Sequence, residues 1–221
     1  AMGDEADSRH VTRSARGAGS GWSEALLGRI HQSLSAVPFH VRTAARCSFL
    51  HFGATRQIIT SGLELLRTDR GVSGGEDVLE INNDLAEGGA VSGGRSWVEG
   101  CRIADHVRLG RDSVLIGAEV VAPTRLPDGA CVDLLAGHDR TGNRMVFIRC
   151  YGVDDTFKEP LEAGGTFCNI PIAEWLEHLD AAPADVWDDE LGPEERTLWT
   201  ARIFPAVADP EDWTDWLWMF D

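Results

Sequence analysis

Apolar residues recur at every sixth position through the middle of the chain. The series has eight consecutive members, which are Leu79, Leu85, Val91, Trp97, Ile103, Leu109, Leu115 and Val121. An α-helix repeats every ~3.6 residues and a strand every two, so neither explains this spacing. A period of six is typical of a parallel β-helix, in which each hexad forms one face of a triangular coil and points its apolar residue into the axis. The series therefore predicts a mainly β chain with a left-handed parallel β-helix over residues 71–130.

The fifth position of each hexad supports this prediction with two exceptions. A small or β-branched residue is preferred there, and four hexads comply, namely at Gly89, Cys101, Val107 and Ser113. Arg95 and Glu119 depart from the preference, and the apolar run 114–116 permits a one-residue shift of register. The alternative is a set of short strands that are evenly spaced, as in many all-β proteins.

Helices and one strand are expected before the coil. Residues 1–21 are polar, rich in Gly, Ser and Arg and without periodicity, so we expect a disordered lead. Ser23 is a favourable N-cap for a short helix with one apolar side. A strand over 48–52 leads through a turn to Thr55, which can cap a second helix. Residues 22–70 are therefore expected to form a helix and a strand-turn-helix segment of α/β character that leads into the coil.

A hairpin and a helical tail are expected after the coil. Two strands flank a polar turn within residues 131–152, and this hairpin could cap the open end of the coil. From 153 to 221 the pattern indicates loops and helices, with Pro171 starting one helix. Because the chain stops inside an apolar helix, we expect it to be a fragment of a larger polypeptide.

Tryptophan is concentrated in this tail. Six of the eight tryptophans lie beyond residue 170. Large aromatic residues at helical spacing usually form core, and the alternative is a platform on which a sugar stacks.

Composition narrows the class of protein. The 221 residues carry a formal net charge of −16, and twelve of the acids lie between 180 and 221, so nucleic acid is an unfavourable partner. No apolar run reaches the length of a membrane span, so no membrane partner is expected. The five cysteines are odd in number and form no CxxC pair, which argues against a disulfide framework and a zinc site. They indicate reduced thiols in a cytoplasmic protein.

Two stretches carry candidate binding chemistry. The turn 154–158 contains Asp154, Asp155 and the only lysine of the chain, Lys158. Carboxylates beside a cation can bind a metal or sugar hydroxyls, and the alternative is a solvated loop. His51 is a candidate general base or orienting donor, and the alternative is a half-buried polar group with its hydrogen bonds satisfied.

Complete catalytic machinery is not visible in the sequence. His106 lies within a hexad, where coil-lining histidines serve as bases in β-helix acyltransferases, but it has no nearby partner. The Gly-rich stretches 71–75 and 88–94 do not match a phosphate-binding loop, and no serine or cysteine nucleophile elbow occurs. We therefore expect no catalytic residue and no metal site in this chain.

Six short strings occur in a consistent order between residues 48 and 221. They are Phe49-Leu50-His51-Phe52-Gly53-Ala54-Thr55, Thr166-Phe167-Cys168-Asn169-Ile170-Pro171, Glu174-Trp175, Asp185-Val186-Trp187, Leu198-Trp199-Thr200-Ala201-Arg202-Ile203-Phe204-Pro205 and Trp216-Leu217-Trp218-Met219. Together they resemble the L-fucokinase family, which includes the bifunctional fucokinase/GDP-fucose pyrophosphorylases. The string around Arg202 is also similar to the corresponding stretch of GDP-fucose pyrophosphorylase.

The resemblance implies an architecture and a pair of reactions. Such proteins place a nucleotidyltransferase-like α/β domain first, a left-handed β-helix next and, in the kinases, a GHMP-type ATP-binding domain last, and this chain matches the middle part. The implied parent reactions are phosphorylation of L-fucose by ATP and conversion of fucose 1-phosphate with GTP to GDP-fucose, both with magnesium. No cofactor is expected in this chain itself. The implied partners are the nucleotidyltransferase-like or GHMP kinase domain, and a second copy of the chain.

The resemblance transfers binding candidates and no catalytic residue. It marks Asn169, Arg202 and the turn 154–158 as places where the tail meets a sugar or a neighbouring domain. With the histidine noted above, the substrate-binding candidates are His51, Asp154, Asp155, Lys158, Asn169 and Arg202.

Three functional hypotheses remain. The first is the β-helix region of a fucokinase or GDP-fucose pyrophosphorylase type of enzyme, with a structural or domain-docking role. The second is a stand-alone module that binds a sugar or sugar phosphate without catalysis. The third, a β-helix acyltransferase, ranks last because eight hexads make fewer than three turns.

Overall fold

The computed structural model describes residues 8–38, 40–43, 45, 47, 52–70 and 78–221. The chain divides into two compact units, Ala1–Phe49 and Leu50–Asp221. The first unit contains helices α1 (Ser8–Gly17) and α2 (Glu24–Ser35). The Ser23 hydroxyl accepts a hydrogen bond from the Leu26 N–H at 3.3 Å, as its predicted role as N-cap requires. The sequence pattern predicts no regular structure over the residues of helix α1. The helix forms there because it packs against α2, and this contact stabilises it.

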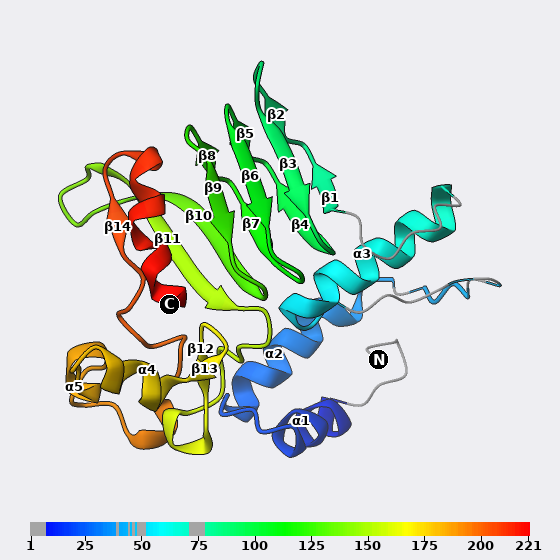
Figure 1. The fold of residues 1–221 in the computed structure, drawn as a ribbon. Coiled ribbons are helices and arrows are strands. Elements are labelled where there is room, and N and C mark those ends of the chain that lie inside the picture. The colour runs from blue at the N-terminus through cyan, green and yellow to red at the C-terminus, as the bar shows by residue number, and fades with distance from the viewer. Residues whose placement is uncertain (1–7, 39, 44, 46, 48–51, 71–77) are drawn as a thin grey trace. The chain divides into compact units, whose positions relative to one another are not determined.

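The second unit contains the remaining elements, shown in Figure 1. In chain order they are α3 (Thr55–Arg70), β1 (Val78–Ile81), β2 (Asp84–Leu85), β3 (Ala90–Gly93), β4 (Ser96–Glu99), β5 (Arg102–Ile103), β6 (His106–Leu109), β7 (Val114–Ile116), β8 (Glu119–Val120), β9 (Thr124–Leu126), β10 (Ala130–His138), β11 (Arg144–Gly152), η1 (Leu161–Ala163), β12 (Thr166–Phe167), β13 (Ile170–Pro171), α4 (Ile172–His178), α5 (Pro183–Val186), η2 (Pro193–Glu195), β14 (Ala206–Val207) and η3 (Pro210–Phe220).

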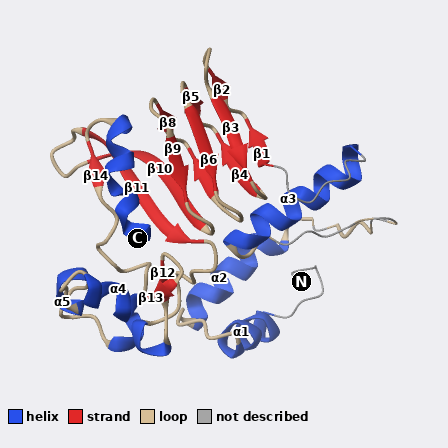
Figure 2. Cartoon of the chain, viewed as in Figure 1, coloured by secondary structure: helices blue, strands red, loops and turns tan. Residues whose placement is uncertain are grey.

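Strands β1 to β10 form a parallel β-solenoid of about three turns, in which successive strands go to different sheets. One sheet has the order β1-β4-β7-β10-β11-β14, the second β2-β5-β8 and the third β3-β6-β9. Pairing along the solenoid is parallel, and β10 and β11 then form an antiparallel hairpin. Figure 2 shows these strands stacked rung upon rung. The predicted parallel β-helix is confirmed as a solenoid, and its left hand stays a prediction.

The turns of the solenoid differ in length, which corrects part of the predicted register. Val78 pairs with Ser96, 18 positions later, whereas Trp97 pairs with Val114, 17 positions later. A strict period of six therefore cannot hold through the coil, because one missing residue moves a side chain to the opposite face of its strand.

Of the eight members of the six-residue series, three are core residues as predicted, Val91 packs half-buried against that core, and four, including Leu85 at 45% exposed, lie outside it. Ile103, Leu109 and Leu115 are buried in the solenoid core. Leu79 and Trp97 instead belong to a second hydrophobic cluster with α3, on the outer face of the six-stranded sheet. Val121 is 49% exposed, because its neighbour Val120 takes the inward position. Val98 likewise replaces Trp97 in the core.

Helix α3 covers the outer face of the six-stranded sheet. Its buried Ile59 and Leu63 pack in one cluster with residues of β1, β7 and β10. The helix approaches closely at Gly62, where a Cβ atom would lie 2.6 Å from the Trp97 ring. At the start of α3 the Gln57 side chain, and not the expected Thr55, accepts the hydrogen bonds of Gly53 and Ala54, at 2.7 and 3.0 Å.

An ion-pair network joins α3 to the solenoid. Asp112 accepts hydrogen bonds from Arg95 (2.5 and 2.7 Å) and from Arg56 (2.6 Å). Arg56 also pairs with both carboxylate oxygens of Asp154, each at 2.6 Å. Hydrogen bonds from Arg95, and after it those from Arg56, hold the pKa of the Asp112 carboxyl below its ordinary value. Because the Asp112 side chain is only 11% exposed, this contribution is screened less than that of a surface pair.

The lowered pKa of Asp112 predicts a loss of stability in acid. A carboxyl whose pKa is lower in the folded state stabilises the fold fully above its ordinary pKa of about 3.9 and loses this contribution as the pH falls through the folded value. Asp112→Asn should therefore reduce the difference in free energy of unfolding between pH 7 and pH 3, and asparagine tolerates the positive φ of 59° at this position. Urea unfolding at both pH values measures this difference. The control is Asp189→Asn at an exposed position, and an equal reduction in the control would contradict the assignment to Asp112.

The tail continues the solenoid core. Trp175, Trp187 and Trp213 are buried in the same cluster as Val98 and Leu126 of the coil. The predicted core role of the tryptophans therefore holds for these three residues, and Pro171 lies immediately before α4 as expected. Among the residues that the structure describes, no helix combines the length and apolar character needed to cross a membrane.

Candidate functional site

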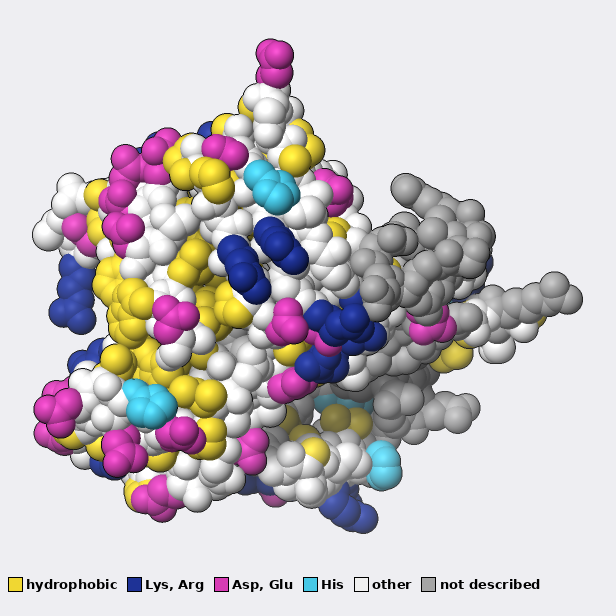
Figure 3. All heavy atoms as spheres, in the orientation of Figure 1, with side chains coloured by type: hydrophobic (Ala, Val, Ile, Leu, Met, Phe, Trp, Pro, Cys, Tyr) yellow, Lys and Arg dark blue, Asp and Glu magenta, His cyan; other side chains and the backbone are white. Residues whose placement is uncertain are grey.

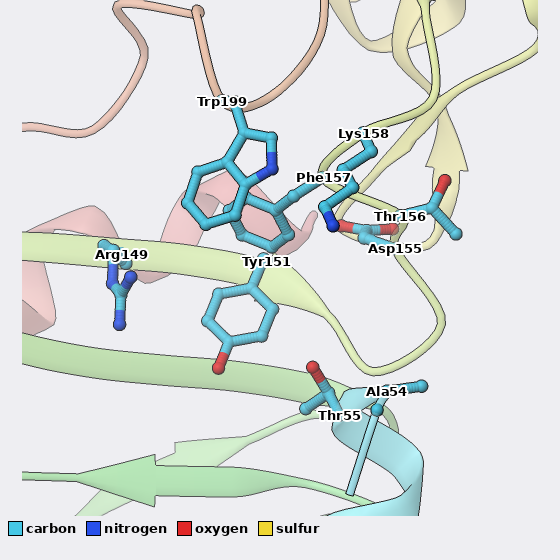
Figure 4. Close-up of a pocket in the computed structure, with 10 residues that line it drawn as sticks. Ala54, Thr55, Arg149, Tyr151, Asp155, Thr156, Phe157, Lys158 and Trp199 are labelled. Atoms are coloured by element: carbon cyan, nitrogen blue, oxygen red, sulfur yellow. The ribbon is translucent and has the colours of Figure 1, made fainter. Parts of the chain in front are cut away.

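A pocket of about 350 Å³ lies where the start of α3, the strand β11 and the loop after β11 meet. Its lining residues are Gly53, Ala54, Thr55, Arg149, Tyr151, Asp155, Thr156, Phe157, Lys158 and Trp199. Figure 4 shows three aromatic rings from three separate segments arranged across the pocket. We call it the aromatic pocket.

Strand β11 supplies two of the lining side chains by its alternation. Arg149 and Tyr151 are two residues apart, so both project from the same face of the strand. The Tyr151 ring meets Phe157 edge to face, with centroids 5.3 Å apart. Burial raises the pKa of the Tyr151 hydroxyl, so it is a neutral hydrogen-bonding group at physiological pH. Thr55 places its hydroxyl beside that of Tyr151 (Figure 4).

Trp199 reaches the pocket from the tail. Its backbone N–H donates to the Phe157 carbonyl at 3.1 Å, and the two rings lie 5.6 Å apart at 60°. The neighbouring Leu198 is buried in the core, whereas Trp199 is 64% exposed. The indole is therefore held in place by the backbone and by one ring while most of its surface remains open to a ligand.

Asp155 holds the loop that carries Phe157 and Lys158. One carboxylate oxygen accepts hydrogen bonds from the Gly152 N–H (2.6 Å) and the Cys168 N–H (2.7 Å). The other accepts from the Thr166 hydroxyl at 2.8 Å and from the Asn169 N–H at 3.1 Å. With this residue only 9% exposed, both oxygens serve the fold, and Asp155 is a positioning residue.

The partner of Asp155 is a two-residue turn with a defined conformation. Cys168 and Asn169 connect β12 to β13 and have φ values of 52° and 68°. Two consecutive positive φ values are typical of a type I′ hairpin turn, and the two N–H groups then face the same carboxylate. Part of the string 166–171 therefore has a structural role, which is to form the hairpin turn whose N–H groups bind the Asp155 carboxylate.

The cations of the pocket differ in availability. Lys158 is exposed, and the structure gives it no ion pair with a described residue. Arg149 pairs with the buried Asp133 of β10, and its Nε is buried without a hydrogen-bond partner among the described residues. Lys158 is therefore the cation that can meet a charged ligand directly.

The structure brings two of the six predicted site residues into the pocket, Asp155 and Lys158. Asp154 and Asn169 instead line an adjacent groove, and the Asp154 carboxylate forms an ion pair with Arg56 there. Arg202 lies on the surface and pairs with Asp188 at 2.8 Å, outside both sites. His51 lies outside the described residues.

Sequence reasoning missed Tyr151, Phe157, Trp199, Arg149 and Thr55 as pocket residues. Strand alternation could have paired Arg149 with Tyr151, which is the only tyrosine of the chain. No local signal indicates that Trp199 lies next to Phe157.

The chemistry of the pocket suits binding. It offers aromatic faces, hydroxyls and a cation, and its lining contains no nucleophile paired with a base. Burial raises the pKa of the Cys150 thiol to about 12 and also that of Cys131 and Cys168, which makes these three thiols poor nucleophiles. In the described part of the chain no three His, Cys, Asp or Glu side chains are grouped to hold a metal ion, so we derive no step through magnesium.

Comparisons with known proteins identify the family. The family model described as the fucose pyrophosphorylase domain matches residues 23–209, which is most of the chain. Neither curated proteins nor solved structures return a match. The matched range includes the whole solenoid and every residue of the aromatic pocket. The chain therefore belongs to the fucose pyrophosphorylase domain family.

Proposed function

We propose that this chain is the solenoid region of a sugar nucleotidyltransferase that converts fucose 1-phosphate and GTP to GDP-fucose, and that its aromatic pocket binds the sugar phosphate. Membership of the fucose pyrophosphorylase domain family supports the reaction class. The observation that carries the binding role is the exposed Trp199 indole, held above a pocket with hydroxyls and with Lys158, which forms no ion pair among the described residues. Fucokinase activity and a cytoplasmic location stay predictions.

The shape and chemistry of the pocket suit a monosaccharide phosphate. Its volume of about 350 Å³ is at the small end of the range for small-molecule sites, ~300–1,000 Å³. The apolar C–H face of a sugar ring packs favourably on an exposed indole. Thr55, Thr156 and Tyr151 offer hydroxyls for the sugar, and the Lys158 ammonium offers a charge for its phosphate.

Removing the indole should weaken binding without unfolding the chain. Trp199→Ala is expected to reduce affinity for fucose 1-phosphate by about tenfold, since an aromatic contact of this kind contributes about 0.5–1.5 kcal/mol beyond the area that it buries. Isothermal titration calorimetry with fucose 1-phosphate and with L-fucose measures the effect. Trp218→Ala is the matched control, because Trp218 is also exposed, at 43%, and lies outside the pocket. Equal affinity of Trp199→Ala and the unaltered chain would contradict the proposal.

A docking role for a nucleotidyltransferase-like domain is the second candidate. Strands β1, β2 and β3 begin their sheets, and no described strand pairs with their outer edges. Leu85 of β2 is 45% exposed at this end. Open edges of this kind favour pairing with another polypeptide. Co-sedimentation of such a domain, together with no heat from fucose 1-phosphate, would favour docking over sugar binding.

A further inference from the structure

A second groove, of about 500 Å³, lies on the outer side of the sheet β3-β6-β9. Its polar lining residues are Ser92, His106, Arg108, Arg111, Arg125 and Asp128. In the view of Figure 3, basic side chains and a histidine lie together over the strands of the solenoid. The groove shares no lining residue with the aromatic pocket, so the two are separate sites. We call it the basic groove.

The register of the sheet places two arginines directly side by side. Arg108 of β6 pairs with Arg125 of β9, and Ser92 of β3 pairs with Arg108 on the other side. Neighbouring strands are about 4.8 Å apart, so the two guanidinium groups extend in parallel from adjacent rungs. Both arginines are exposed, while Leu109 and Leu126 beside them point into the core.

Without a bound ligand, the adjacent arginines lower the stability of the fold. Like charges that face each other across a strand pair are destabilising. Neither Arg108 nor Arg125 has an ion pair with any residue that the structure describes. The groove contains one carboxylate, Asp128, against three arginines, and one oxygen of Asp128 already accepts from the Arg111 N–H at 2.9 Å. The positive charge is local, because the chain as a whole carries −16.

The groove has room for a small ligand beside these charges, because its volume is about 500 Å³ and part of its lining consists of glycines, Gly93, Gly94 and Gly110. The Ser92 hydroxyl and the His106 Nε2, 2.7 Å apart, add polar groups beside the arginines. Guanidinium groups bind phosphate oxygens with paired hydrogen bonds, and two of them neutralise a doubly charged phosphate.

We propose that Arg108 and Arg125 form a binding site for the phosphate group of a small ligand, separate from the aromatic pocket. Inorganic phosphate, pyrophosphate and the phosphates of a nucleotide share this chemistry. The groove volume lies within the range for small-molecule sites, ~300–1,000 Å³. Bound phosphate relieves the repulsion between the two arginines and so stabilises the fold.

Titration calorimetry and thermal unfolding test this site. Phosphate, pyrophosphate and GTP are used as separate ligands, and sodium chloride keeps the ionic strength constant. The unaltered chain is expected to bind at least one ligand and to unfold at a higher temperature in its presence. Arg108→Gln and Arg125→Gln should each weaken that binding by about tenfold or more. Each should also unfold at a higher temperature than the unaltered chain when no phosphate is present, because the like-charge contact is removed. This increase is an effect that a merely damaged fold cannot produce.

The matched control is Arg140→Gln, which removes one exposed charge from the turn between β10 and β11. It should leave phosphate binding unchanged. Affinity that is unchanged by Arg108→Gln and Arg125→Gln, or that Arg140→Gln lowers to the same extent as these two variants, overturns the proposal. The three ligands distinguish free phosphate from a nucleotide, and fucose 1-phosphate binding that survives in Arg108→Gln but not in Trp199→Ala shows that the two sites are independent.

Discussion

Replacing Trp213 with alanine is expected to lower the free energy of unfolding by about 3–5 kcal/mol, the usual cost of deleting a buried large aromatic side chain. Trp213 is fully buried in the cluster that the coil and the tail share. Its indole N–H donates to the Glu119 carbonyl of β8 at 2.7 Å. Strand β8 is the last strand of its sheet, so this bond satisfies a carbonyl at an edge of the solenoid. The substitution therefore removes packing and also leaves a polar group without its partner.

Two further variants separate these effects. Trp213→Phe keeps an aromatic ring and loses the hydrogen bond, so its cost should be smaller, about 1–3 kcal/mol. Trp218→Ala, at an exposed position of the same segment η3, should change the free energy of unfolding by no more than about 0.5 kcal/mol. Denaturant unfolding followed by circular dichroism measures all three. If Trp213→Ala and Trp218→Ala unfold at the same denaturant concentration, η3 does not stabilise the end of the solenoid.

Replacing Asp155 with alanine is the second change with a large expected effect. The buried Gly152 and Cys168 N–H groups would lose their acceptor, and each unsatisfied buried donor costs about 1–3 kcal/mol. The expected loss in free energy of unfolding is therefore about 2–6 kcal/mol, which is a large share of the stability of an ordinary domain. Asp155→Asn should also destabilise, because the amide nitrogen cannot accept a hydrogen bond.

The neighbouring residue provides the control for Asp155. Asp154 pairs with Arg56 at the surface, and its side chain is 62% exposed. Asp154→Ala should therefore cost no more than about 1 kcal/mol. Denaturant unfolding of both variants tests the contrast. Equal effects of Asp154→Ala and Asp155→Ala would mean that the hydrogen bonds to Asp155 do not hold the loop.

Asp154 and Asp155 show which part of a site the sequence can predict and which part it cannot. The turn 154–158 is recognisable as a candidate because acids and the only lysine lie next to each other. Which carboxylate is buried depends on the turn at Cys168 and Asn169, whose N–H groups come from a different hairpin. No local pattern in 154–158 contains that information.

The presence of the solenoid could be predicted because short strands recur at a nearly regular spacing, which is a local property. That spacing identifies inward residues such as Ile103 and Leu109 correctly. The error at Trp97 has the same origin, since one shorter turn reverses the face of a strand and the sequence does not mark it. Trp97 instead lies half-buried on the outer face, where it packs against the cluster that contains Ile59 and Leu63 of helix α3.

By itself, the sequence determined the class of fold, the presence of the coil and the family resemblance, because periodicity and short strings are properties of neighbouring residues. Only the tertiary structure decided which apolar residues face the axis, that Thr55, Tyr151 and Trp199 line one pocket, and that Arg108 lies beside Arg125. The reason is that each of these facts depends on packing or pairing between segments far apart in the chain. Such contacts are set by the length of every intervening turn and leave no local signal.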